Sequence, residues 1–167
     1  LRAFEERGLS METLFSLMFQ EKENIMYERS AGYRIESFTY GEVEKRIKAR
    51  AASLQKLLAD VERGSVIGLS MDNSLSWIEC FWAILLCGFR PLLINLRLPQ
   101  KTVEDALRNC GVQAVISDRR TYFVRTIMSD EIERSDETYT PGAFGTEIIV
   151  MTSGTSRHVK LCAYSAK

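Results

Sequence analysis

The chain has 167 residues, of which 46% are hydrophobic and 26% charged, a profile typical of a globular domain and not of a disordered tail. Lysine plus arginine and aspartate plus glutamate both number 22, so the formal net charge is zero. A zero balance argues against a dedicated nucleic-acid binder and against a polybasic membrane patch. The most apolar run, Cys80 to Phe89, is too short to span a bilayer.

The cysteines and the histidine argue against a metal centre. The four cysteines are Cys80, Cys87, Cys110 and Cys162, with no C-x-x-C pair among them, and His158 is the only histidine. A zinc site needs four such ligands at suitable spacing, so none is expected. Free thiols in an apolar stretch favour a reducing compartment, and we therefore predict a cytoplasmic protein whose cysteines are inert core residues.

The first part of the chain predicts a helix, a hairpin and a second helix. Ser10 precedes an amphipathic pattern in the position of an N-cap. Residues 24–28 and 34–39 alternate on either side of a glycine and predict a small β-hairpin. From Thr39 onward apolar residues recur with the helical period, and Glu42 stands three residues later, as in a capping box.

Strand and helix patterns alternate over the rest of the chain. Strands are expected at 66–71, 91–95, 113–117, 147–151 and 159–164. Helices are expected at 77–87, after an Asp-Asn-Ser cap, and from Pro99 as first helical residue to Cys110. Residues 119–139 show no regular pattern, and 129–145 are expected to form a surface loop. The sequence therefore predicts an α/β fold: a mainly parallel sheet with helices on both faces, preceded by a helix and a small hairpin.

The segment after the fourth expected strand carries the strongest chemical signal. An apolar run leads directly into a cluster of hydroxyls, a glycine and a lysine, namely Thr152, Ser153, Gly154, Thr155, Ser156 and Lys160. Hydroxyls and free backbone N–H groups bind phosphate oxygens, glycine allows close approach of the backbone, and lysine adds positive charge. The pattern suits a triphosphate tail. It is not a P-loop, because no second glycine precedes Lys160, and a plain polar hairpin turn remains the alternative.

The same loop resembles the phosphate-binding loop of the adenylate-forming (AMP-binding) enzymes, which reads roughly T-S-G-T-T-G-x-P-K-G. This superfamily holds acyl-CoA synthetases, peptide-synthetase adenylation domains and luciferases. Four further segments resemble the family in the family's order, at residues 38–43, 64–74, 88–99 and 114–118. Together these segments cover residues 11 to about 165 of the chain.

The resemblance implies both an activity and a missing part. It implies that residues 1–167 are the N-terminal fragment of an AMP-binding domain, an expectation that agrees with ends at Leu1 and Lys167 that look cut. The parent is then expected to activate a carboxylic acid with ATP and Mg²⁺ and to pass the acyl group to a thiol, CoA. The loop residues would bind phosphate, while no catalytic residue and no metal ligand is assigned. The fragment alone is expected to be inactive and to self-associate through exposed apolar surface.

Three departures from the family pattern keep other functions open. Arg157 and Leu161 stand where the family has glycine, and Val159 stands where it has proline. A loop that needs glycine conformations is disturbed by such changes, which favours a catalytically degenerate homologue acting as a binding or scaffold module. A peptide-synthetase adenylation domain and an unrelated α/β interaction module are the remaining alternatives.

Several conspicuous residues are given structural roles. Trp77, Phe81 and Trp82 are expected to pack in the core rather than to line an acyl pocket. The acidic residues of 130–133 are expected to lie on a solvated loop, because no partner is present to tune their pKa. His158 is expected to be an exposed turn residue.

Overall fold

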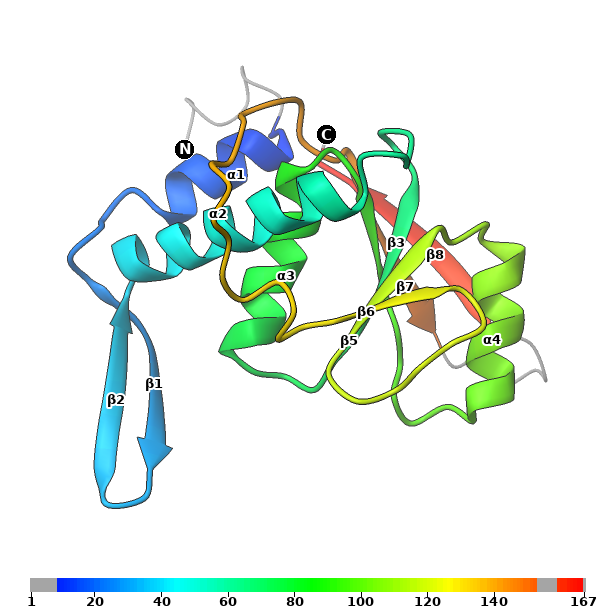
Figure 1. Ribbon diagram of the computed structural model, residues 1–167, viewed down its shortest axis with the longest axis horizontal. Helices are drawn as coiled ribbons and strands as arrows, with labels where there is room; N and C mark the ends of the chain where they lie inside the picture. Colours follow the sequence, from blue (N-terminus) through cyan, green and yellow to red (C-terminus); the bar gives the residue numbers. More distant parts are fainter. Residues whose placement is uncertain (1–8, 153–158, 167) are drawn as a thin grey trace.

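The computed structural model describes residues 9–152 and 159–166 (Figure 1). In chain order its elements are α1 (Met11–Met18), β1 (Ile25–Ala31), β2 (Arg34–Thr39), α2 (Tyr40–Leu57), β3 (Val66–Ser70), α3 (Leu75–Leu86), β4 (Arg90–Leu93), α4 (Gln100–Asn109), β5 (Ala114–Ser117), β6 (Arg125–Met128), β7 (Glu147–Thr152) and β8 (Lys160–Ser165).

A six-stranded sheet in the order β6-β5-β3-β4-β7-β8 organises the fold. The first five strands are parallel, and β8 pairs antiparallel with β7. Ile67 and Leu69 of β3 pack with α1, α2 and α3, whereas Val66 packs with α4. Alternate side chains of β3 therefore enter two cores, one on each face of the sheet. The predicted α/β architecture, with a mainly parallel sheet covered on both faces, is confirmed.

The predicted N-caps of α1, α2 and α3 are also confirmed, because each depends on local chemistry. The Ser10 hydroxyl accepts a hydrogen bond from a backbone N–H in the first turn of α1, and Ser74 does the same at α3. Thr39 and Glu42 form a reciprocal capping box at α2, with bonds of 2.8 and 3.2 Å. Each cap contributes about 1 kcal/mol. The β1–β2 hairpin extends away from the sheet and helices (Figure 1).

Two expectations drawn from local patterns are corrected. Pro99 precedes α4 instead of opening it, because its ψ of 143° is not helical and the helix begins at Gln100. Residues 119–139 contain a strand that the pattern did not indicate, β6, which pairs parallel with β5. Only Ile127 of this edge strand is fully buried, so its sequence lacks the apolar run of an inner strand.

The segment from 129 to 146 is largely exposed, as predicted for a surface loop, but a few anchors also hold it as a strap between β6 and β7. Its Ile132 side chain is fully buried in the core. The Gln55 side chain of α2 makes two hydrogen bonds to the backbone of Thr140, at 2.7 and 3.0 Å. Near its end the Gly145 N–H donates to the carbonyl of Leu85 at 2.8 Å. A few anchors in a polar sequence thus hold the strap against the helices (Figure 1).

The burial of Cys80 and Cys87 predicts a difference in thiol reactivity. Burial raises the pKa of both thiols to about 12, whereas Cys110 and Cys162 are only half-buried. The thiolate is the reacting form, so Cys80 and Cys87 should resist iodoacetamide at pH 8 until the protein unfolds. Mass spectrometry of alkylated peptides, before and after denaturation, measures this. Labelling of Cys80 or Cys87 in the folded protein as fast as in the denatured protein would contradict their burial.

Candidate functional site

The carboxyl ends of the parallel strands meet at one edge of the sheet, and a cleft lies there. From β3 the chain passes into α3 on one face, and from β4 it passes into α4 on the opposite face. Ligands in open α/β sheets bind where neighbouring connections diverge in this way. The cleft has a volume of about 450 Å³. It is lined by Met71, Asp72, Asn73, Trp77, Leu93, Ile94, Asn95, Leu96, Arg97, Val150 and Met151.

One wall of the cleft is apolar and its rim is polar. Trp77 stacks on Phe81 with ring centroids 5.4 Å apart and an interplanar angle of 4°. At the rim, the Asn95 side chain accepts a hydrogen bond from the Arg97 N–H at 3.0 Å. This short turn fixes the chain as it leaves β4. The cleft therefore offers an aromatic surface beside amide and guanidinium groups, a combination that suits a ligand with both apolar and charged parts.

The three aromatic residues assigned to the core divide between two environments. Trp82 is buried and packs edge-on against Phe15, with centroids 5.2 Å apart, so its prediction is confirmed. Trp77 and Phe81 are half-buried and pack against the edge of the core, and Trp77 also lines the cleft. The helical pattern could not separate these two environments. It identifies the apolar face of α3, but it does not show which part of that face lies next to the strand ends that form the cleft.

Charged groups connect the turns that follow β3, β4 and β5. The Asp118 carboxylate accepts a hydrogen bond from the Asp72 N–H at 3.0 Å, and Arg119 pairs with the Asp72 carboxylate. Arg120 donates to the carbonyl of Leu96 at 2.9 Å. These contacts hold three separate turns at one rim. The sequence holds a signal for them, because each of these charged residues lies within three residues of the end of a buried strand.

The structure places two of the predicted phosphate-binding residues opposite one another. Thr152 ends β7, Lys160 begins β8, and the two are partners in the antiparallel register. The Thr152 hydroxyl donates to the Lys160 carbonyl at 3.2 Å, while the Lys160 side chain is exposed. The two predicted strands on either side of the loop are therefore present and paired, and β7 contributes Val150 and Met151 to the cleft. Ser153, Gly154, Thr155 and Ser156 lie outside the described residues, as do Arg157 and His158.

The sequence profile of the family described as AMP-binding enzyme matches residues 19–157, and the chain belongs to this family. A comparison with curated proteins gives no significant match.

Solved structures of adenylate-forming proteins share the fold. The NpsA N-terminal subdomain of Klebsiella oxytoca, in complex with 3-hydroxyanthranilyl-AMSN, is similar with a TM-score of 0.81 and 17% identity, covering 98% of this chain and 43% of that one. O-succinylbenzoate CoA synthetase (MenE) of Bacillus subtilis, in complex with AMP, gives 0.72 and 19%, covering 89% and 40%. The same enzyme with its acyl-adenylate intermediate gives 0.69 and 21%, again covering 89% and 40%. The chain thus spans about two fifths of these structures.

Within 9–152 and 159–166, no group of three or more His, Cys, Asp or Glu side chains is placed to hold a metal ion. In the same part of the chain no helix is both long enough and apolar enough to cross a membrane.

Proposed function

We propose that the protein is an adenylate-forming ligase that activates a carboxylic acid with ATP. Residues 1–167 are then the first part of its large AMP-binding domain, with the remaining catalytic groups on other segments of the protein. The observation that carries the proposal is the pairing of Thr152 with Lys160 on β7 and β8, where β7 also lines the cleft, in a member of the AMP-binding family. Similar structures hold AMP and an acyl-adenylate intermediate, which agrees with this chemistry.

In this reaction a carboxylate oxygen attacks the α-phosphorus of ATP, and the bond to the β-phosphate oxygen breaks. The products are an acyl-adenylate and pyrophosphate. The sulfur of a thiol, CoA, then attacks the acyl carbon, and AMP leaves. The β- and γ-phosphates are bound by hydroxyls and backbone N–H groups of the loop, from Thr152, Ser153, Gly154, Thr155 and Ser156, and Lys160 balances their charge. Mg²⁺ accompanies the nucleotide. Because Thr152 and Lys160 sit on paired strands, the two ends of the loop are held before the nucleotide binds.

Exchange of labelled pyrophosphate into ATP, dependent on an added carboxylic acid, tests this function in the complete protein. We expect exchange with at least one member of a panel of acids of increasing chain length. Lys160→Met should reduce it about 10- to 100-fold, the range expected for losing a hydrogen bond to a charged group. Lys101→Met, an exposed lysine on α4, is the matched control. Exchange that is unchanged in Lys160→Met would remove the loop from the mechanism.

The departures at Arg157, Val159 and Leu161 favour one second candidate, a degenerate homologue that acts as a binding or scaffold module. Such a protein would show no exchange with any acid. Replacing Arg157 by glycine should then create ATP binding, measured by calorimetry, whereas a working loop would change little. A peptide-synthetase adenylation domain would share the exchange reaction but would transfer the acyl group to a carrier domain instead of CoA.

A further inference from the structure

A second hollow, of about 380 Å³, lies between α1, α2, the end of α3 and the strap. Four of its eleven lining residues are aromatic: Phe15 and Phe19 come from α1 and its C-cap, and Tyr139 and Phe144 come from the strap. The rings of Phe15 and Phe144 lie 5.8 Å apart. The Tyr139 hydroxyl donates to the carbonyl of Leu86 at 3.3 Å, so it already has a partner inside the protein. These walls suit a hydrocarbon chain or an aromatic ring.

The mouth of this hollow carries two ammonium groups around one carboxylate. Lys22 pairs with Glu44, and Lys48 donates to Glu44 at 2.9 Å. Both lysine side chains are nearly half exposed, at 47% and 46%, while Glu44 is 16% exposed. Although burial raises it, hydrogen bonds from the two lysines hold the pKa of Glu44 below its ordinary value. The three groups therefore carry a net charge of +1, and each ammonium keeps N–H donors for a second anion.

We propose that this hollow binds a small amphiphilic acid, with its apolar tail against Phe144, Tyr139 and Phe15 and its carboxylate at Lys22 and Lys48. The tail removes apolar surface from water, and the carboxylate gains charge-assisted hydrogen bonds. An alcohol with the same tail gains only the first of these. The hollow shares no lining residue with the cleft at the strand ends, so this site is independent of the proposed catalytic function.

Trp82 provides a reporter for ligand binding in the hollow. Its ring lies 5.2 Å from Phe15 and 6.4 Å from Phe19, both of which line the hollow. The chain has two tryptophans, so the Trp77→Phe background leaves Trp82 as the only one in this chain. In that background we expect a saturable fluorescence change on titration with octanoate, and 1-octanol should bind about fivefold more weakly or worse. Lys48→Met should weaken the binding of octanoate by about the same factor and leave the affinity for 1-octanol unchanged.

Two further variants locate the bound acid. Ser16 is exposed on α1 and lines the hollow, so Ser16→Phe should block both ligands without removing a core side chain. Arg97→Met changes the cleft at the strand ends and should leave the octanoate titration as it was. Equal affinities for octanoate and 1-octanol, or unchanged octanoate binding in Lys48→Met, would overturn the proposal. Loss of binding in Arg97→Met would also overturn it, because the acid would then lie in the cleft.

Discussion

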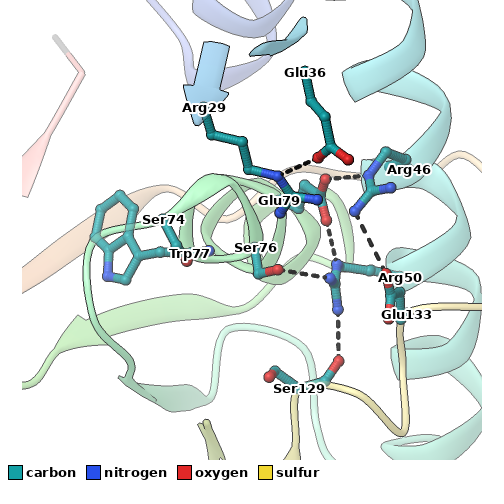
Figure 2. Close-up of polar contacts among 10 residues, drawn as sticks. All are labelled: Arg29, Glu36, Arg46, Arg50, Ser74, Ser76, Trp77, Glu79, Ser129 and Glu133. Carbon is teal, nitrogen blue, oxygen red and sulfur yellow. Dashed lines mark hydrogen bonds and ion pairs between the residues drawn. The ribbon is translucent and has the colours of Figure 1, made fainter. Parts of the chain in front are cut away.

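Replacing Glu79 by alanine is expected to lower the free energy of unfolding by about 3–5 kcal/mol, the cost of removing one partner from a buried ion pair. Figure 2 shows the contacts of this carboxylate, which is fully buried. Arg50, only 2% exposed, donates to it at 2.7 Å, and Arg46 pairs with its other oxygen. Arg50 also donates to the carbonyl of Ser129 at 2.6 Å and to the Ser76 hydroxyl at 3.3 Å. Without Glu79, the buried Arg50 guanidinium loses its counter-charge.

Urea unfolding, followed by circular dichroism, measures the effect on the complete protein. The double variant Arg50→Met with Glu79→Leu should recover most of the loss, because apolar replacement of both partners is often close to neutral. Glu36→Ala breaks the exposed ion pair with Arg29, which is also drawn in Figure 2. Its free energy of unfolding should stay close to that of the wild type. A Glu79→Ala variant as stable as wild type would show that this network contributes no stability.

Gly145→Ala is expected to destabilise the protein by about 3 kcal/mol or more, at the upper end of the cost of overpacking. A Cβ at this position would overlap the carbonyl oxygen of Phe89 and lie 3.1 Å from the Leu85 side chain. Both obstacles are held in place, because Gly145 also donates to the Leu85 carbonyl and Phe89 directly precedes β4. The start of β7 would therefore have to move, and β7 leads to the proposed phosphate loop.

Gly142→Ala is a matched control on the same strap. There a Cβ would meet only the guanidinium end of Arg63, at 2.8 Å, and that exposed side chain can move aside. We expect a small change in its urea midpoint and a large one for Gly145→Ala. Similar midpoints for the two variants would contradict the close approach of the strap to the segment before β4.

The elements predicted from sequence were those that local chemistry determines. Ser10 and the pair Thr39 and Glu42 act within one helical turn, so their patterns identified the helix starts. The anchors of the strap were not predicted, because Gln55 and Thr140 are distant in sequence and neither is unusual alone. The sequence gives a weak signal for the Glu79 network, because Glu79 is the only charged residue of α3. A pattern can mark such a residue but cannot name its partner.

The candidate site also has a part that the sequence predicts and a part that only the fold reveals. The hydroxyls, glycine and lysine of 152–160 form a contiguous motif, so its chemistry was visible in the sequence. Asn95, Arg97 and Trp77 line a cleft only because β3, β4 and β7 are neighbours at the centre of the sheet. Strand order is a long-range property that periodicity does not encode. The phosphate-binding roles of the loop residues stay a prediction.

The segment from Thr152 to Lys160 is proposed to hold the phosphates of ATP, and an ATP titration of the complete protein by calorimetry tests this role most directly. We expect saturable binding that Lys160→Met weakens about tenfold or more and that Lys101→Met leaves unchanged. Equal affinity of wild type and Lys160→Met for ATP would contradict this role, because the nucleotide would then bind without this loop.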